Sequence, residues 1–196
     1  AVDRLIEEVA RIHGYDRIPD RAPSGQLVGP SLREDRVGVA ALRDQLAARG
    51  WFEAITYAFV AREQLEAWDL AEGAIALANP LSAALSVMRT SLLPGLVAAL
   101  AANRSRQQAR VRLFEVGRAY LGGDAGPRES DRIAGAACGR AAAEQWGESA
   151  RPLDFFDIKG DVESLLALTA AAGEFRCEQV SRPWLHPGRS AAILRG

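Results

Sequence analysis

The sequence predicts an α+β fold in which helices flank an antiparallel sheet. Apolar residues recur at helical spacing in some segments, while other segments alternate or are rich in β-branched and aromatic residues. Regular strand–helix–strand units are few, which favours an antiparallel sheet over a parallel one. Hydrophobic residues make up 48% of the 196-residue chain and charged residues 25%. This balance is usual for a globular protein with a substantial core.

The expected helices are marked by apolar stripes and by residues that begin or stop helices. Gly14 and Gly50 each follow a helical pattern and are expected to end it, and Pro94 is tolerated in a first turn. Asp157 and Asp161 flank a helix start, where capping is a likelier role for them than catalysis. The predicted helices cover residues 2–12, 35–49, 62–68, 92–108 and 160–172.

The expected strands are marked by β-branched and aromatic residues and by alternation. Val111 and Leu113 alternate with Arg110 and Arg112, so one face of that strand is predicted to be dry and the other wet. The polar stretch 140–153 is expected to lie outside the regular elements. The predicted strands cover residues 51–60, 74–78, 110–120, 132–139, 175–180 and 190–195.

The chain is expected to have three parts. Residues 14–34 contain three prolines and three glycines, which is typical of a linker. Residues 1–18 form an amphipathic helical pattern that is interpreted as the C-terminal tail of another module, and residues 19–34 as the linker. Residues 35–196 are predicted to form one domain.

Composition excludes several classes of function. The net charge is −1 and Lys159 is the single lysine, so no overall field attracts nucleic acid or an anionic membrane. Cys138 and Cys177 form no CxxC pair, which argues against a zinc site. The longest uncharged apolar run, residues 91–103, is shorter than the ~20 residues of a membrane span. No signal peptide is visible, and a cytoplasmic location without a membrane partner is expected.

Five segments together resemble the β subunit of bacterial phenylalanyl-tRNA synthetase. They occur in the order and at about the spacing of that family, across almost the whole chain. They are LIEEVARIHGYD at 5–16, EAITYAF at 53–59, the stretch 78–120 with VMRTSLLPGL and VRLFEVGRAY, DFFDIKGD at 154–161, and HPGRSA at 186–191.

The resemblance implies both a fold and a role. Residues 1–18 would end a DNA-binding-like module, and residues 35–196 would form a core like that of class II aminoacyl-tRNA synthetases, truncated at its C-terminal end. Such a domain is expected to be non-catalytic, so no catalytic residue is assigned. It would support an α subunit in an α2β2 assembly that uses ATP and Mg²⁺ to join phenylalanine to its tRNA. Residues 35–49 and 51–59 are expected to pack against the α subunit.

Arg89, Arg112 and Arg118 are the candidates for a vestigial ligand groove. Class II activation requires cations at the ATP phosphates, because negative charge builds up there during the reaction. No late Gly-x-Gly-x-x-Arg element supplies the second arginine of that fold. The three arginines are therefore expected mainly to be part of the sheet architecture. For Arg89, the favoured alternative is a capping turn in which it pairs with a nearby carboxylate.

The resemblance also implies a magnesium site at the start of the first helix. Glu7 and Glu8 match the paired glutamates of the family, while Asp3 lies one position away from its aspartate. Magnesium prefers a few carboxylate oxygens together with water molecules. The alternative is that the acids form helical ion pairs, Glu7 with Arg11 and Arg4 with Glu8.

Two further functions are kept as alternatives. The first is a stand-alone class II core that makes an acyl-adenylate by itself, which pyrophosphate exchange would reveal. The second is a tRNA-binding module without catalysis, against which the near-zero charge and the scarcity of lysine argue.

Overall fold

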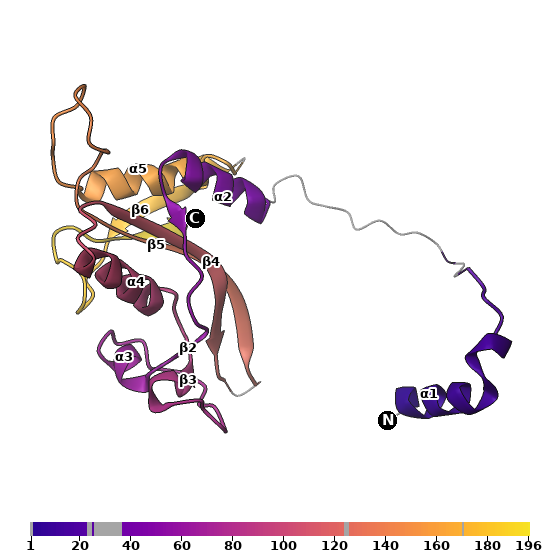
Figure 1. Cartoon of the computed structure of the whole chain (residues 1–196). Helices are drawn as coiled ribbons and strands as arrows, with labels where there is room; N and C mark the ends of the chain where they lie inside the picture. The colour runs from indigo at the N-terminus through magenta and orange to yellow at the C-terminus, as the bar shows by residue number, and fades with distance from the viewer. Residues whose placement is uncertain (1, 23–24, 26–36, 124–125, 170) are drawn as a thin grey trace. The chain divides into compact units, whose positions relative to one another are not determined.

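The chain forms two compact units, Ala1–Arg33 and Glu34–Gly196, which are described separately. A computed structural model describes residues 2–22, 25, 37–123, 126–169 and 171–196 (Figure 1). Most of the expected linker 19–34, and the first two residues of the helix expected at 35–49, lie outside these ranges. The domain boundaries expected at residues 18 and 34 remain predictions.

The described residues of the first unit form one helix, α1, with bounds Val2–His13, followed by a 3-10 turn, η1, at Tyr15–Arg17. Gly14 lies between them with a φ of 93°, a conformation that glycine adopts without strain, so its predicted role in ending the helix is confirmed. The apolar side chains along α1 are exposed. They are Leu5, Ile6, Val9 and Ile12.

The main sheet of the second unit has three strands in the order β1–β4–β5. The long pair β4–β5 is antiparallel, with Val111 opposite Cys138 at one end and Leu121 opposite Arg128 at the other. The short strand β1 runs parallel to β4, so the sheet is mixed and the expectation of a wholly antiparallel sheet is corrected. The strands are Phe52–Glu53 for β1, Val111–Leu121 for β4 and Arg128–Cys138 for β5.

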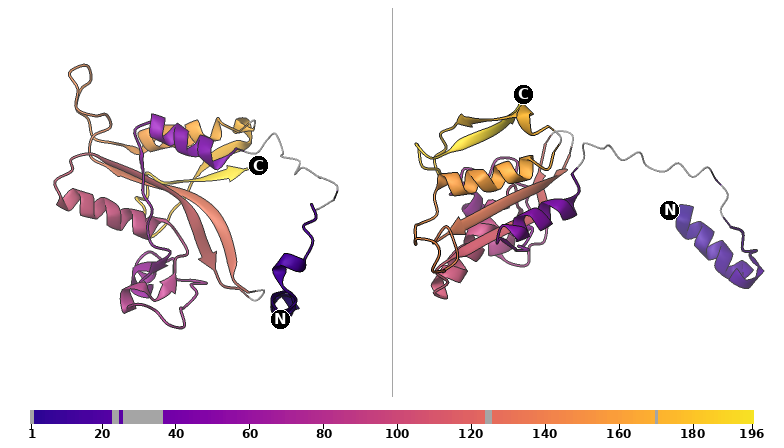
Figure 2. Two further views of the ribbon diagram at one scale, coloured as in Figure 1. Left: turned by 45° about the vertical axis from the view of Figure 1, so that its right-hand side comes forward. Right: turned by 90° about the horizontal axis from the view of Figure 1, so that it is seen from above.

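Helices cover both faces of this sheet (Figures 1 and 2). On one face, α2 and α5 enclose an apolar cluster built around Leu46, Trp51 and Phe114. On the other face lies α4, with Leu96 fully buried. The predicted wet face of β4 is therefore wrong: Arg112 and Phe114 keep only 8% and 2% of their exposure. The helices are Val39–Ala48 for α2, Leu93–Ser105 for α4 and Phe155–Leu166 for α5.

Two smaller antiparallel pairs complete the unit. Strands β2 and β3 pack with helix α3 around Val60, Leu65 and Val87, which are all buried. Strands β6 and β7 form a hairpin near the C-terminus. The bounds are Phe59–Val60 for β2, Arg62–Glu66 for α3, Val87–Met88 for β3, Phe175–Gln179 for β6 and Ala191–Arg195 for β7, with 3-10 turns at Ala83–Leu85 (η2) and Ala172–Glu174 (η3).

Several strand predictions differ from the structure. The single strand expected at 51–60 is two short strands in different sheets, because the backbone N–H of Ala54 makes the last bond to β4 before the chain leaves that sheet. The strand expected at 74–78 is only a bridge between Ala76 and Val87. The pairing of Val87 and Met88 with β2 was not expected from the sequence.

The last helix begins earlier than residue 160 because of a capping box. The Oδ1 atom of Asp154 accepts hydrogen bonds from the backbone N–H groups of Phe156 and Asp157, while a carboxylate oxygen of Asp157 accepts one from the N–H of Asp154. Asp157 is thus part of the cap as expected, whereas Asp161 is not, since it lies buried within the helix. Among the described residues, no helix has the length and apolar character that crossing a membrane requires.

Candidate functional site

Arg89 is held inside the second unit by a dense set of hydrogen bonds. Its Nη1 atom lies 2.7 Å from Oε1 of Glu115, and the two side chains keep 6% and 3% of their exposure. The Nε atom donates to the carbonyl oxygen of Arg118 at 2.9 Å, and Nη1 also donates to the hydroxyl of Thr56 at 3.0 Å. Arg89 thus pairs with a carboxylate as expected, but the partner lies on β4, 26 positions away, and not in a capping turn.

Glycine at position 117 makes room for this ion pair. A Cβ atom there would lie 2.6 Å from Nη2 of Arg89 and 3.0 Å from Oε1 of Glu115. The Oε2 atom of Glu115 accepts a further hydrogen bond from the hydroxyl of Thr56 at 2.7 Å. The segment Phe-Glu-Val-Gly on β4 therefore supplies both the carboxylate that neutralises Arg89 and the space that the ion pair fills. The positive charge of Arg89 is not available to a ligand.

Arg112 lies on the face of β4 opposite to that of Glu115, because alternate side chains of a strand point to opposite faces. Its Nη2 atom lies 2.8 Å from Oδ2 of Asp161, and its guanidinium stacks 5.1 Å from the centre of the Trp51 ring. The Nε atom of Arg49 bonds to the other oxygen of Asp161 at 2.5 Å. Burial lowers the pKa of Arg112, and this effect exceeds the opposing effect of Asp161.

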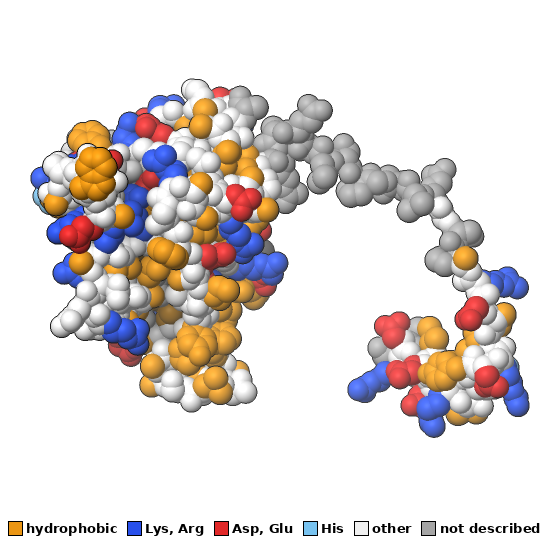
Figure 3. All heavy atoms as spheres, turned by 45° about the horizontal axis from the view of Figure 1, so that its top comes forward, with side chains coloured by type: hydrophobic (Ala, Val, Ile, Leu, Met, Phe, Trp, Pro, Cys, Tyr) orange, Lys and Arg blue, Asp and Glu red, His pale blue; other side chains and the backbone are white. Residues whose placement is uncertain are grey.

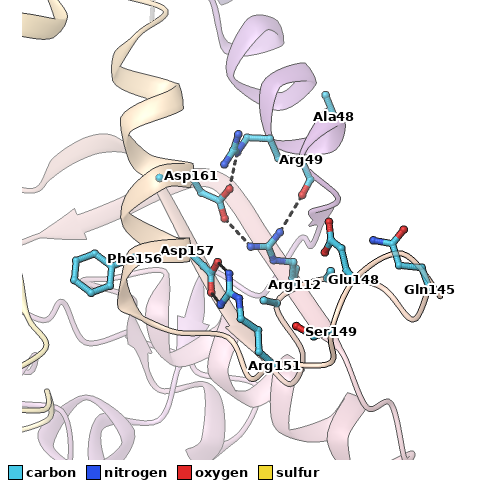
Figure 4. Close-up of a pocket in the computed structure, with 13 residues that line it drawn as sticks. Ala48, Arg49, Arg112, Gln145, Glu148, Ser149, Arg151, Phe156, Asp157 and Asp161 are labelled. Carbon is cyan, nitrogen blue, oxygen red and sulfur yellow. Dashed lines mark hydrogen bonds and ion pairs between the residues drawn. The ribbon is translucent and has the colours of Figure 1, made fainter.

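A polar cavity of about 1030 Å³ opens beside this cluster, between the end of α2, the first turns of α5 and the loop 141–151 (Figure 4). Figure 4 shows the Arg112 guanidinium between Asp161 and Arg49, while Gln145, Glu148 and Ser149 line the cavity from the loop. We call this space the α2–α5 cavity. Its volume is at the upper end of the range typical of small-molecule sites.

Arg118 is exposed at the far end of β4. Its guanidinium pairs with Glu129 at 2.7 Å and with Asp131 at 3.5 Å, and both partners come from β5. The hydrogen bond from Arg118 to Glu129 is the largest cause that raises the pKa of the arginine. Six positions separate Arg118 from Arg112 on the same face of the strand, a distance of roughly 20 Å.

The three arginines therefore do not line one groove, and that expectation is corrected. Arg89 is enclosed on one face of β4, Arg112 borders the α2–α5 cavity on the other face, and Arg118 belongs to a surface ion-pair group. The physical reason is the alternation of the strand together with the helices that cover both of its faces. Each of the three arginines is paired with at least one carboxylate: Arg89 with Glu115, Arg112 with the Asp161 that it shares with Arg49, and Arg118 with Glu129 and Asp131.

The acidic residues proposed for magnesium are all exposed on α1. Asp3 and Glu7 are four positions apart and share a helix face, whereas Glu8 is turned away from Glu7 by about 100°. Glu8 is engaged by Arg11, whose Nη2 atom lies 2.6 Å from Oε2. This is an i,i+3 pair rather than either of the i,i+4 pairs expected.

The described residues contain no group of three or more His, Cys, Asp and Glu side chains that could hold a metal. By themselves, Asp3, Glu7 and Glu8 therefore do not fit a carboxylate cage for magnesium. The assignment of these residues to a metal stays a prediction.

Large apolar side chains are exposed on β1 and on the segment that follows it. Phe52, Ile55 and Tyr57 keep 70%, 92% and 75% of their exposure, and we call these three residues the β1 surface. Strand β1 is at an edge of its sheet. On the face of the larger unit that Figure 3 shows, acidic and basic side chains are interspersed among apolar ones. Exposed, grouped apolar residues are typical of protein–protein interfaces.

The sequence did not predict that four side chains would form one buried cluster. They are Arg49, Trp51, Arg112 and Asp161. The indole N–H of Trp51 donates to Oδ2 of Asp161 at 3.0 Å, so this carboxylate accepts from three side chains, one on β4 and two in the turn between α2 and β1. A signal was present, since Asp161 falls at a position flanked by apolar residues in a helix. Acidic residues are rarely buried without partners, so a basic partner could have been sought.

The family model and the most similar curated sequences have the same description. The model of the family described as "Phenylalanyl tRNA synthetase beta chain CLM domain" matches residues 18–196. A phenylalanine–tRNA ligase β subunit of Xanthomonas euvesicatoria is 52% identical over 97% of this chain and 24% of its own length, and one of Xylella fastidiosa is 48% identical over 96% and 24%. The chain thus spans about a quarter of the length of the curated relatives it matches.

Among solved structures, a pyrrolysyl-tRNA synthetase of Desulfitobacterium hafniense is similar with a TM-score of 0.49 and 18% identity, over 74% of this chain and 50% of that one. A histidine–tRNA ligase subunit of Alicyclobacillus acidocaldarius gives a TM-score of 0.46 and 22% identity, over 82% and 44%. Similarity at this level carries no argument about function.

Proposed function

Because the chain belongs to the family of phenylalanyl-tRNA synthetase β chains, we propose that it works as a non-catalytic domain of such a β subunit. In this proposal it is shaped like a class II synthetase core and supports an α subunit that joins phenylalanine to its tRNA, using ATP and Mg²⁺. The holoenzyme is an α2β2 assembly in the cytoplasm, a reducing compartment in which the free thiols of Cys138 and Cys177 persist.

The single observation that carries the non-catalytic role is the internal neutralisation of Arg89 and Arg112. Each guanidinium is at least nine-tenths buried and paired with a carboxylate, Glu115 or Asp161. A phosphate-binding arginine must approach the substrate with free donors, because its role is to stabilise charge that develops on the phosphate. An arginine held by a carboxylate inside the protein cannot do so without breaking a buried ion pair.

The β1 surface supports the proposal of an α-subunit partner. Burying an aromatic side chain at an interface contributes about 1.5–3 kcal/mol relative to leaving it in water. Phe52 and Tyr57 are both more than two-thirds exposed in the chain alone. They lie in the segment 51–59, directly after α2, which the family resemblance leads us to expect against the α subunit.

Copurification with the cognate α subunit tests the partner. Phe52→Glu and Tyr57→Glu are each expected to weaken the complex by about 30-fold, since roughly 2 kcal/mol of apolar contact would be replaced by a desolvated charge. Leu81→Glu is the matched control, because Leu81 is 87% exposed but lies in a loop between β2 and β3. Equal affinity of all three variants would exclude the β1 surface as the interface.

Pyrophosphate exchange with phenylalanine and ATP separates this proposal from a stand-alone enzyme. We expect no exchange above background from the chain alone. Exchange that is lost in Arg89→Met or Arg112→Met but retained in Arg118→Met would instead establish a self-sufficient adenylate-forming site.

A further inference from the structure

Two large aromatic side chains are left in water where the chain passes from β5 to α5. The relative exposure of Trp146, in the connecting loop, is 102%, and that of Phe156, in the first turn of α5, is 74%. Tryptophan is highly buried on average, because its ring is the largest apolar surface that a side chain carries. It is also enriched among the residues that dominate the affinity of protein–protein interfaces. A wholly exposed indole is therefore a candidate anchor for a partner.

The loop that carries Trp146 is closed at its base. The backbone N–H of Ala141 donates to the carbonyl oxygen of Arg151 at 3.1 Å, and the N–H of Leu153 donates to that of Gly139 at 2.9 Å. Figure 1 shows that the loop projects from the second unit beyond the start of α5. Because the base is fixed, less conformational freedom remains to be lost when the loop binds a partner.

The tip of this loop is acidic. The ten residues between Arg140 and Arg151 include two carboxylates and no basic side chain. Trp146 lies between these acids, two positions from each. Glu144 lies 3.6 Å from Arg140 but keeps 89% of its exposure, and Glu148 makes no ion pair in the part of the chain that the structure describes. Such a tip repels the phosphates of RNA and is complementary to a protein surface with basic side chains.

The loop leaves the main sheet at the end where β1 lies. Phe52 on β1 is paired with Leu113 on β4, and Leu113 is opposite Ala136 on β5. Gly139, the first residue of the loop, is three positions beyond Ala136. With the usual spacing and rise of strands, its backbone lies within roughly 15 Å of that of Phe52. A partner that covers the β1 surface can therefore also reach the loop.

We propose that Trp146 and Phe156 form a second contact with the α subunit, and we call these two residues the loop surface. The indole enters an apolar pocket of the α subunit that is rimmed by basic side chains, and Glu144 and Glu148 pair with that rim. This inference rests on the function proposed above. It names a part of the interface that the β1 surface does not include.

Fluorine NMR of the chain labelled with 5-fluorotryptophan tests whether Trp146 becomes buried. The chain has four tryptophans, so a Trp146→Phe variant identifies the resonance of Trp146. In the chain alone, this resonance should move between H₂O and D₂O, as expected of an indole in full contact with solvent. We expect this solvent isotope shift to disappear when the cognate α subunit is added, because the indole then leaves the water.

Variants measure how much the loop surface contributes to affinity. Trp146→Ser is expected to weaken binding of the α subunit by about 10-fold or more, since a tryptophan at an interface is often an energetic hot spot. Leu81→Ser is the matched control, because Leu81 is 87% exposed on another loop, and its affinity should change by less than about 2-fold. Glu148→Gln should make the affinity depend less on salt concentration.

The outcomes separate this inference from the proposed function. If the complex forms but the resonance of Trp146 keeps its isotope shift, or if Trp146→Ser binds as tightly as Leu81→Ser, the loop surface is not part of the interface and the proposal is overturned. If no complex forms at all, the proposed function fails, and the loop surface fails with it. Loss of the isotope shift on addition of tRNA alone would assign Trp146 to a nucleic acid and would also overturn the proposal.

Discussion

Replacing Glu115 by leucine is expected to destabilise the second unit severely. In the native structure this carboxylate accepts hydrogen bonds from Nη1 of Arg89 and from the hydroxyl of Thr56, both at 2.7 Å, and the residue keeps 2% of its exposure. Glu115→Leu would leave the Arg89 side chain, which keeps 6% of its exposure, without a counter-ion. Breaking a buried ion pair in this way costs about 3–5 kcal/mol.

The loss is large compared with the stability of an ordinary domain, which is about 5–15 kcal/mol. For a chain of this size it corresponds to a decrease in Tm of roughly 6–20 °C. Arg89→Met/Glu115→Leu removes both charges and should cost less than Glu115→Leu alone. Its residual cost, about 1–3 kcal/mol, comes from the carbonyl oxygens of Thr56 and Arg118, which lose their donor.

Urea unfolding followed by tryptophan fluorescence measures these differences, since the chain has four tryptophans. Arg118→Met is the matched control on the same strand, because its ion pair with Glu129 is exposed and contributes no more than about 1 kcal/mol. If Glu115→Leu lost no more stability than Arg118→Met, or if the double variant were less stable than both single ones, the structural role of the Arg89–Glu115 pair would be refuted.

Two further predictions concern acid stability and the glycine of β4. The pKa of Asp157 is lowered well below its usual value, first by the hydrogen bond from Arg151 and then by the N–H of Asp154. A lowered folded-state pKa gives stability that is present above the unfolded pKa of about 3.9 and is lost as the pH falls below it. Unfolding curves between pH 5 and pH 2 should therefore show a smaller loss in Asp157→Asn than in the unmodified chain, and equal losses would contradict this cause. Gly117→Ala should lower Tm by more than about 5 °C, because its Cβ would lie 2.6 Å from Arg89; Gly123→Ala, where nothing lies within 4 Å, should leave Tm nearly unchanged in the same scan.

The parts of the fold that depend on local sequence were predictable. Gly14 ends α1 because glycine adopts positive φ readily, and this preference needs no tertiary information. The long strand β4 was expected within one residue of its bounds, since eleven residues of alternating and β-branched composition specify a strand by themselves. The pairing of Arg89 with a carboxylate could be expected in kind, because a buried arginine requires one, although its partner Glu115 could not be named.

Features that depend on distant contacts were not predictable. The sequence around Arg112 is compatible with a wet face, and only the docking of α5 and α2 over that face makes it buried. Asp161 is 49 positions from Arg112 and 112 from Arg49, so no local pattern connects them. The segment 51–60 has strand composition throughout, but its middle is drawn out of the sheet where Thr56 bonds to Glu115.

The Arg89–Glu115 pair also affects how the sequence can change over evolutionary time. The two residues are 26 positions apart, and replacing either one alone leaves a buried charge unpaired. A lineage can therefore exchange the pair only through an intermediate that folds poorly, or through two changes at nearly the same time. The Arg-Thr-Ser and Phe-Glu-Val-Gly segments can consequently persist for a purely architectural reason. In the non-catalytic domain proposed above, these segments would then be inherited because their charges support one another.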